Sequence, residues 1–328
     1  MKSYVDRRGF LTAIGAAAMA AGIPSRALAQ GSGPTLNLGI QNTSWGAIGM
    51  VAEAEKTFVK AKADVKVFRF NSGKATRDAM IAGRIDIGVL GATPFIVGVA
   101  KGEIVGIAAA MYAGKTNAVV AAANSGIKTV ADLKGKRVAS QLGSATDYVF
   151  QNKVLPKFGL TKGDVQIVNV TFQNQVAALI GKSVDAFAGV EPFPSVAEVE
   201  GLGTVLVDYE DFDLQPVFLG INRPVLEGRH DAVVAFMRGW LLAVDIINKE
   251  PDRAVRIVWD QFKSQGYDIK EAVIKRMMSK IEVTPDYVPK LKQYLVEQSQ
   301  DLVDHKQIAA IPDWSKELNT QIVAQAKG

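Results

Sequence analysis

From Thr35 onward, short apolar runs rich in β-branched residues alternate with longer runs in which apolar residues recur at helical spacing. This alternation is typical of α/β proteins, in which a strand is followed by a helix that covers one face of a sheet. Strands are predicted over residues 36–40, 65–70, 85–90, 117–123, 136–140, 165–170, 184–190 and 218–221. The run IDIGVL at 85–90 is nearly all apolar, which predicts a strand covered on both faces.

Helices are predicted over the segments 48–62, 74–82, from about 144, near 175–180, and 231–248. In the last of these, apolar residues three and four positions apart lie on one helical face: Val234, Met237, Leu241, Val244 and Ile247. Thr93 and Pro94 follow a predicted strand. We expect Thr93 to be the N-cap of the next helix, because threonine accepts a backbone hydrogen bond there and proline suits the first helical position.

One part of this pattern occurs twice. Five residues of the first copy recur in the second at a constant offset: Ala79, Gly83, Gly91, Pro94 and Phe95 become Ala177, Gly181, Gly189, Pro192 and Phe193. Each copy predicts a helix, a glycine stop, an apolar strand and a loop that ends in Pro-Phe. In the same register Thr93 aligns with Glu191. Five matches can arise by chance in an α/β protein, but they fit two related lobes that present the same loop to a shared cleft.

The first 29 residues have the pattern of a signal peptide. A short basic segment ends in Arg7-Arg8, an apolar stretch rich in Ala and Gly follows at 10–23, and the Ala-Leu-Ala triplet at 27–29 matches a cleavage site. The apolar stretch is shorter than the ~20 residues needed to cross a bilayer, which argues against a membrane anchor. The arginine pair indicates the twin-arginine (Tat) route, so we expect cleavage after residue 29 and a periplasmic protein.

The charge and the cysteine count support this interpretation. Residues 1–29 contain three arginines and one lysine against one aspartate, so their removal lowers the formal net charge from +5 to +2. A nearly neutral chain has no basic surface that indicates nucleic-acid binding. Cysteine is absent, which excludes disulfides and a lipid-anchored cysteine. An exported protein without an anchor is retained only by an enclosing outer membrane, and the remaining ~300 residues suit two lobes better than one core.

Three segments make the chain resemble a known family. They are FNSGKATRDAMIAGRIDIGVLGATPFIVGVAKG at 70–102, SGIKTVADLKGKRVAS at 125–140 and VDAFAGVEPF at 184–193. In this order and spacing they resemble the NitT/TauT family of periplasmic substrate-binding proteins, which includes taurine, alkanesulfonate, nitrate and thiamine-pyrimidine binders. The likeness runs from about residue 36 to about residue 251, and it is weaker for the ligand than for the family.

The resemblance implies an α/β chain with a type II periplasmic-binding fold, in which two α/β lobes are joined by two hinge crossovers. Residues 34–117 and 222–328 would form lobe 1 and residues 118–221 would form lobe 2. The crossovers would fall at 117–123 and 218–221. Ligand binding would close the lobes by a hinge motion.

The general behaviour of α/β sheets predicts the ligand-binding residues. Ligands lie beyond the carboxyl ends of parallel strands, where helix N-termini face a crevice. The candidates in those loops and at the first crossover are Gln41, Trp45, Ser72, Gly73, Ala92, Thr93, Asn117, Ser144, Thr146 and Glu191. The loops contain no lysine or arginine, but free N–H groups at helix starts can hold a sulfonate, phosphate or carboxylate without one.

Most of these candidates have a second interpretation. Ser72, Thr93 and Ser144 can serve only as helix caps, although a capping hydroxyl can also face a ligand. Trp45 is either a stacking wall for the ligand or a core aromatic residue. Asn117 either bridges the two lobes or ends a turn.

Glu191 discriminates best among ligands, because a carboxylate at the end of an apolar strand is costly to bury without a partner. One interpretation is an interlobe ion pair with Lys115 or Arg77. The favoured one is an acceptor for a ligand ammonium or amine. Such a carboxylate would repel a bare anion such as nitrate and attract a zwitterion such as taurine or the amino group of an aminopyrimidine.

The sequence therefore predicts a monomeric solute-binding component of an ABC importer, which passes its ligand to an inner-membrane permease with its ATPase. A taurine- or alkanesulfonate-like solute is favoured. An aminopyrimidine or nitrate-type binder, or a periplasmic sensor subunit, remains an alternative. No cofactor, metal site or catalytic residue is expected: the chain has only two histidines, no cysteine, and no H-E-x-x-H or G-x-S-x-G motif. The export signal argues against a cytoplasmic regulator.

Overall fold

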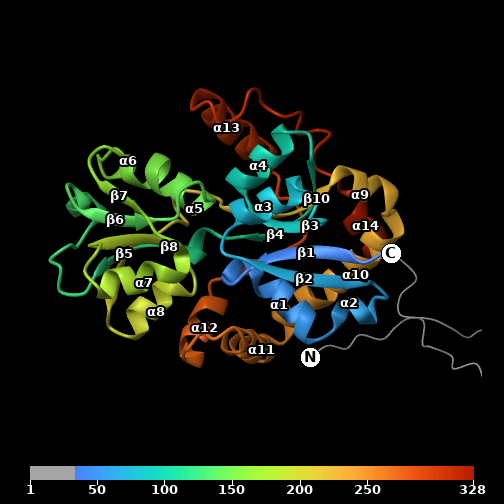
Figure 1. The fold of residues 1–328 in the computed structure, drawn as a ribbon, viewed down its shortest axis with the longest axis horizontal. Helices are drawn as coiled ribbons and strands as arrows, with labels where there is room; N and C mark the ends of the chain where they lie inside the picture. Colours follow the sequence, from blue (N-terminus) through green and yellow to red (C-terminus); the bar gives the residue numbers. More distant parts are fainter. Residues whose placement is uncertain (1–33) are drawn as a thin grey trace, which may run out of the picture. The chain divides into compact units, whose positions relative to one another are not determined.

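Two β-sheets, each flanked by helices, organise the part of the chain that the structure describes, residues 34–328 of a computed structural model (Figure 1). The predicted signal peptide lies outside these residues. We call the six-stranded sheet with α1–α4 and α9–α14 the first lobe, and the five-stranded sheet with α5–α8 the second lobe. No helix among residues 34–328 is long and apolar enough to cross a membrane.

The sheet of the first lobe has the strand order β11-β4-β10-β3-β1-β2. In chain order its strands are β1 (Leu36–Gln41), β2 (Val65–Phe70), β3 (Ile87–Gly91), β4 (Ile104–Tyr112), β10 (Pro216–Asn222) and β11 (Glu282–Val283). β1 pairs in parallel with β2 and β3, whereas β10 runs antiparallel to β3 and β4. The parallel strands end on one edge, which is where the sequence places the ligand loops.

The sheet of the second lobe has the order β7-β6-β8-β5-β9. Its strands are β5 (Asn117–Ala122), β6 (Arg137–Ser140), β7 (Gln166–Asn169), β8 (Ala186–Val190) and β9 (Gly203–Asp208). β6 pairs in parallel with β7 and β8, and β5 runs antiparallel to β8 and β9. Both sheets therefore combine a parallel core with an antiparallel strand that enters from the other lobe.

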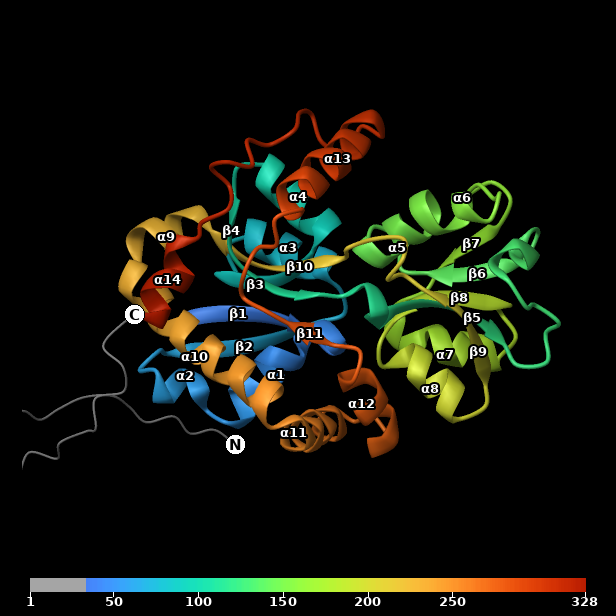
Figure 2. The ribbon, with the colours of Figure 1, turned by 180° about the vertical axis from the view of Figure 1, so that it is seen from behind.

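The helices cover the faces of the two sheets (Figures 1 and 2). They are α1 (Ala47–Ala54), α2 (Thr57–Lys60), α3 (Gly73–Ile81), α4 (Ala92–Ala100), α5 (Ala145–Val149), α6 (Leu155–Lys157), α7 (Phe172–Ile180), α8 (Phe193–Val199), α9 (Arg223–Gly228), α10 (His230–Lys249), α11 (Pro251–Ser264), α12 (Glu271–Met278), α13 (Leu291–Asp304) and α14 (Gln321–Lys327). The helix predicted over 48–62 is divided into α1 and α2, because Lys56 has a left-handed φ of 54°. β4 and β9 were not predicted.

The chain passes between the sheets at two segments, 113–116, which contains the 3-10 turn Gly114–Thr116, and 209–215. The crossovers expected at 117–123 and 218–221 are instead the strands β5 and β10, each of which pairs within one sheet. The side chains of Phe218 and Leu219 in β10 are fully buried, because this strand lies between β3 and β4. The chain thus rejoins the first sheet at Pro216, before the expected boundary at 222.

The longest helix of the core follows its predicted pattern. On α10, Met237 is fully buried, Val234, Val244 and Ile247 are nearly so, and Leu241 is half-buried at the rim. The next face of α10 stacks aromatic rings, with the Phe236 ring 5.0 Å from Phe58 and 6.0 Å from Trp240 between centroids. This packing holds α1, α2 and α10 on the first sheet and supports the loop that follows β1.

Candidate functional site

The loop after β1, residues 41–46, lies where the two lobes meet. Gln41 Nε2 donates hydrogen bonds to Thr76 Oγ1 at 2.7 Å and to the Val89 carbonyl at 3.1 Å, which hold the loop to the first lobe. The Ser44 N–H donates to the Glu191 carbonyl of the second lobe at 2.8 Å. Trp45 Nε1 donates to Thr116 Oγ1, in the first connection, at 3.2 Å. The loop therefore contacts both lobes and one of the segments that join them.

Four polar side-chain atoms of this loop are buried without a hydrogen-bond partner among the described residues. They are Gln41 Oε1, Asn42 Oδ1, Thr43 Oγ1 and Ser44 Oγ. Buried polar atoms are normally paired, because an unpaired one loses its hydration without compensation. Their position at the lobe boundary provides two amide acceptors and two hydroxyl groups for a small polar ligand.

Serine caps begin two of the helices that reach this boundary. Ser72 Oγ accepts a hydrogen bond from the Ala75 N–H at 3.2 Å at the start of α3, and Ser144 Oγ accepts one from the Asp147 N–H at 3.0 Å at the start of α5. The capping interpretation is therefore confirmed for both serines. Their contact with a ligand stays a prediction.

Thr93 has a different role from the one expected. α4 begins at Ala92, so its N-cap is the extended residue Gly91, and the prediction that Thr93 caps this helix is wrong. The helix thus begins directly after β3, two residues earlier than the Thr-Pro pair suggests. The Thr93 hydroxyl instead accepts a hydrogen bond from Gln298 Nε2 of α13 at 2.9 Å.

The starts of α3, α4 and α5 lie together around Gly91. A Cβ atom placed on Gly91 would lie 2.8 Å from the Cβ of Ala145, at the start of α5, and 2.8 Å from the ring of Trp45. A Cβ on Gly73, at the start of α3, would lie 3.5 Å from the Gly91 nitrogen. The loops that carry Ser72, Gly73, Ala92 and Ser144 therefore meet at one place, as the sequence predicts. The first N–H groups of each helix are without an intrahelical partner there.

Trp45 is buried, with 3% of its surface exposed. Its ring lies against Gly91 of its own lobe, close to Ala145 of the second lobe. The interpretation of Trp45 as a core aromatic residue is thus confirmed, and its role as a stacking wall for a ligand stays a prediction.

A polar cavity of about 140 Å³ opens beside these helix starts. It is lined by residues of both lobes, namely Thr93, Gly143, Ser144, Asp147, Tyr148, Gln151, Asn152, Lys162, His305 and Gln307. Two of the predicted ligand residues, Thr93 and Ser144, face it from opposite lobes. The exposed side chains of the cation Lys162 and of His305 also line it, and the sequence offered no local signal for either, because they come from distant segments.

Lys74 is a second cation that the sequence analysis missed. It follows the predicted loop at 71–73 directly, and its Nζ lies 3.6 Å from the position of a Cβ on Gly143 in the other lobe. Its side chain is exposed at the boundary. A lysine here adds positive potential to the helix starts without entering the buried site.

Asn117 and Thr146 form a buried pair within the second lobe. Thr146 Oγ1 donates to Asn117 Oδ1 at 2.7 Å, and Asn117 Nδ2 donates to the Ala113 carbonyl at 2.7 Å. Asn117 is both the first residue of β5 and the residue that ends the 3-10 turn Gly114–Thr116, so the interpretation that it ends a turn is confirmed. It ties the first connection to α5, and whether either residue also contacts a ligand stays a prediction.

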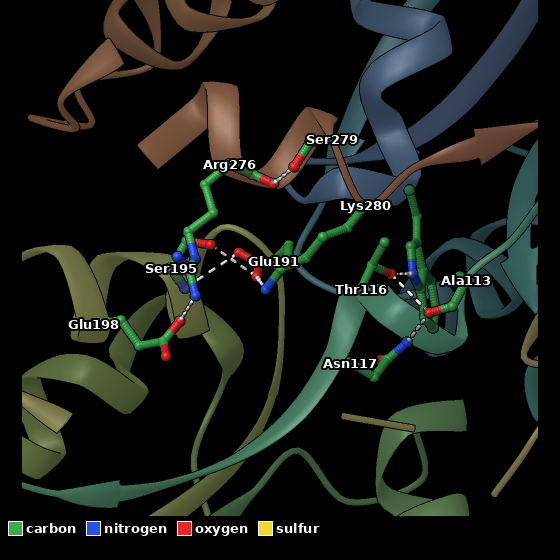
Figure 3. A network of polar contacts seen from close by, with 10 residues as sticks. Ala113, Thr116, Asn117, Glu191, Ser195, Glu198, Arg276, Ser279 and Lys280 are labelled. Atoms are coloured by element: carbon green, nitrogen blue, oxygen red, sulfur yellow. Dashed lines mark hydrogen bonds and ion pairs between the residues drawn. The ribbon is translucent and has the colours of Figure 1, made fainter. Parts of the chain in front are cut away.

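Glu191 is fully buried and its carboxylate is already paired (Figure 3). Ser195 Oγ donates to Oε1 at 2.8 Å, the Ser195 N–H donates to Oε2 at 3.2 Å, and Lys280 Nζ lies 2.5 Å from Oε1. The carboxylate therefore has partners within the protein, and its contact with a ligand amine stays a prediction. The ion-pair alternative holds, with a lysine that is 89 residues away in the sequence.

The two cations first suggested for Glu191 have other partners. Lys115 lies 3.0 Å from both Glu210 and Glu282, whose hydrogen bonds raise its pKa. Arg77 pairs with the neighbouring Asp78 at 2.6 Å. No group of three or more His, Asp or Glu side chains within residues 34–328 is placed to hold a metal ion.

Comparison with known proteins bears on this geometry. A family model described as NMT1/THI5 like matches residues 46–254. The putative aliphatic sulfonates-binding protein of Escherichia coli is 34% identical over 203 residues, which is 61% of this chain and 62% of that protein. The putative aliphatic sulfonates-binding protein of Bacillus subtilis is 30% identical over 241 residues, 73% of this chain and 72% of that protein. The match thus spans less than two thirds of the Escherichia coli relative.

A solved structure shares the fold over nearly the whole described chain. It is the alkanesulfonate-binding protein SsuA from Xanthomonas axonopodis pv. citri bound to MOPS, with a TM-score of 0.77 and 21% identity, covering 88% of this chain and 99% of that one. At this identity the likeness concerns the fold. The predicted two-lobed periplasmic-binding fold is confirmed.

Proposed function

This chain belongs to the NMT1/THI5-like family, whose model matches residues 46–254, and we propose that it captures a small organic sulfonate between its two lobes. The solute would then pass to an inner-membrane ABC permease with its ATPase. The proposed location is the periplasm, reached by the twin-arginine route. We propose no chemical step on the bound solute, and the relatives named above are binding proteins.

The observation that carries the proposal is the meeting of three helix starts around Gly91. Helix N-termini bear partial positive charge and unpaired N–H groups, which suit an anion with several oxygens. The unpaired hydroxyls of Thr43 and Ser44 add donors on the side of the first lobe. A sulfonate has three acceptor oxygens and one negative charge, so it can use donors from both lobes at once.

The charge state of Glu191 bears on the choice of solute. Because Lys280 pairs with this carboxylate, Glu191 is not a free negative charge that repels a simple anion or attracts an amine. This removes the original reason to prefer taurine or an aminopyrimidine. We therefore place an alkanesulfonate first and taurine second. A periplasmic sensor role would use the same capture step with a different receptor.

The proposal can be tested by a thermal-shift screen of residues 30–328, refolded to remove carried-over solute. The panel contains ethanesulfonate, a longer alkanesulfonate, taurine, nitrate and an aminopyrimidine. A true ligand at a hundred times its dissociation constant adds about 2.7 kcal/mol to the free energy of unfolding. Stabilisation by sulfonates alone supports the proposal, and stabilisation by the aminopyrimidine alone contradicts it.

A pair of matched variants tests the anion site itself. Asn and Asp both serve as N-caps, so Ser144→Asn and Ser144→Asp should preserve the start of α5 to the same degree. Only the aspartate places a negative charge beside the proposed sulfonate. We expect Ser144→Asp to bind ethanesulfonate about tenfold or more weakly than Ser144→Asn in calorimetry. Equal affinities would place the anion elsewhere.

A further inference from the structure

Three ion pairs connect the α12 region of the first lobe to the α8 region of the second. Lys280 pairs with Glu191 at 2.5 Å, Arg276 with Glu198 at 2.5 Å, and Lys270 with Glu200 at 2.8 Å. Figure 3 shows the first two, with Arg276 and Lys280 extending from the α12 region toward the carboxylates. Every cation belongs to the segment 270–280 and every carboxylate to the segment 191–200.

The separation of charge between the two segments is systematic. Charges on solvated surfaces are usually mixed in sign, but here each segment contributes one sign only to the contact. Beneath the ion pairs, apolar residues of both helices are buried in one core cluster: Phe193 and Ala197 of α8, and Val273, Ile274 and Met277 of α12. The contact therefore has an apolar base and a charged rim, which is the composition of a specific protein interface.

The backbone around Lys280 is anchored to the first lobe. Two residues after Lys280, β11 pairs with the end of β4, with Glu282 opposite Tyr112 and Val283 opposite Met111. α12 also packs on α11, which lies against α1 of the same lobe (Figure 2). The Lys280 ammonium thus reaches from a fixed point of the first lobe to a carboxylate of the second.

The three pairs differ in burial. The Glu191 side chain is 1% exposed and that of Lys280 22%, whereas the side chains of the Arg276 and Lys270 pairs are more exposed. Exposed ion pairs contribute little and are screened by salt. Removal of one partner of a buried pair is severe, because the remaining charge is left uncompensated. Loss of the Lys280–Glu191 pair should therefore weaken the contact between the lobes more than loss of either exposed pair.

Glu191 also connects this contact to the ligand loop. Its carbonyl accepts the hydrogen bond from the Ser44 N–H at 2.8 Å, and its N–H donates to the Thr116 carbonyl at 2.8 Å. Thr116 in turn accepts from Trp45. The residue that Lys280 holds by its side chain is therefore the residue that receives the ligand loop on its backbone.

We propose that Lys280 is a positioning residue for solute capture, which acts through Glu191 to hold the second lobe in the closed position, assisted by Arg276 and Lys270. The inference rests on the proposed function. Lys280 does not touch the solute; it sets how long the lobes stay together around it. Opening of the lobes exposes Lys280 and Glu191 to water.

The principal test compares Lys280→Met with Lys275→Met. Lys275 lies on the exposed face of α12, five residues before Lys280, and has no carboxylate partner within residues 34–328, so it is a matched loss of charge. We expect Lys280→Met to raise the Kd for the sulfonate identified in the screen by about tenfold to a hundredfold, mainly through faster release. Lys275→Met should leave it unchanged. Equal affinity of the two variants would overturn the proposal.

Two rescue experiments separate positioning from a general loss of stability. Lys280→Arg should restore most of the affinity, because a guanidinium can also pair with Glu191. For the exposed pair Arg276–Glu198, Arg276→Glu and Glu198→Arg should each raise the Kd, and the double variant with both exchanges should have the Kd of the wild type. If the loss of binding free energy in the double variant equals the sum of the losses in the single variants, the interlobe pair is contradicted.

A ligand-independent measurement distinguishes failure of this inference from failure of the proposed function. Small-angle scattering of the solute-free protein should give a larger radius of gyration for Lys280→Met than for Lys275→Met. If no sulfonate binds but this difference appears, the proposed solute is wrong and the role of Lys280 stands. If sulfonates bind and the two variants have the same affinity and size, the role of Lys280 is wrong.

Discussion

The two loops of the internal repeat each contact the C-terminal helical region, but through different kinds of polar interaction. Thr93 and Glu191 occupy equivalent positions, and each accepts a hydrogen bond from a side chain of the C-terminal helical region. Thr93 accepts from Gln298 of α13, and Glu191 accepts from Lys280 after α12. The first contact is between neutral groups and the second is an ion pair.

The same contrast extends to the helices that carry these donors. On the α13 side, the Tyr148 hydroxyl donates to Asp301 at 2.6 Å and the Tyr294 hydroxyl donates to Asp213 at 2.8 Å, where Lys153 also pairs with Asp213. On the α12 side, three cations face three carboxylates. The contacts of α13 are thus mostly hydrogen bonds of phenol groups, whereas the contacts of α12 are ion pairs. Salt should weaken the ion pairs of α12 but should have little effect on the phenol hydrogen bonds of α13.

The largest effect is expected from the glycines of the two loops. A Cβ on Gly91 would meet Trp45 and, across the lobe boundary, Ala145, whereas a Cβ on Gly189 would meet Gln175 and Phe187 within the second lobe. We expect Gly91→Ala to abolish sulfonate binding in calorimetry. Gly189→Ala should retain binding but lower the free energy of unfolding by about 1–3 kcal/mol. The opposite pattern would show that the second loop, not the first, controls closure.

Glu191→Gln is expected to lower the free energy of unfolding more than Thr93→Val does. Glu191→Gln leaves the Lys280 charge without its partner, which should cost about 3 kcal/mol in urea unfolding. Thr93→Val leaves the Gln298 amide unpaired, which should cost about 1–2 kcal/mol. Glu191→Gln should also weaken ethanesulfonate and taurine binding to the same degree. Selective loss of taurine would instead indicate that Glu191 contacts a ligand amine.

A smaller difference is expected in how salt affects the contacts of α12 and those of α13. From about 0.05 to 0.5 M sodium chloride, the wild-type affinity for the sulfonate should fall slightly, since exposed pairs contribute up to about 1 kcal/mol. Arg276→Ala should remove part of this dependence, whereas Tyr148→Phe should leave its slope unchanged. Calorimetry at four salt concentrations would measure both slopes, and equal slopes would contradict the division proposed here.

The smallest effect is expected from pH between 7 and 9. Burial, and then the hydrogen bond to Asp301, raise the pKa of Tyr148; burial and the charge of Asp213 do the same for the pKa of Tyr294. A raised pKa means that the protonated phenol is favoured in the folded state. Its contribution is therefore complete below the unfolded value of about 10 and is lost only at higher pH. The difference in unfolding free energy between the wild type and Tyr148→Phe should be constant from pH 7 to 9. A decrease would show that the phenol ionises earlier.

Local patterns predicted much of the fold. The strands at 36–40, 65–70 and 184–190 and the helix at 231–248 agree with β1, β2, β8 and α10 within a few residues, because period and end signals are encoded in neighbouring residues. β9 was missed although its sequence GTVLVD is rich in β-branched residues, because glycine and acidic residues typical of turns flank it on both sides. β4 was missed because the alanine-rich run IVGIAAAMY has little β-propensity of its own, and its strand form depends on pairing with β10.

The sequence by itself determined the family, the α/β order and the loops that meet at the lobe boundary, since helix starts after parallel strands must lie on one edge of a sheet. Only the tertiary structure decided which sheet β10 joins and which side chains pair across the lobes. Lys280 meets Glu191 across 89 residues, and Gln298 meets Thr93 across 205. Contacts between such distant residues depend on how the helices pack, and no local spacing encodes them. The sequence indicates that a carboxylate at the end of an apolar strand requires a partner when it is buried. The packing of α12 on α8 determines which cation becomes that partner.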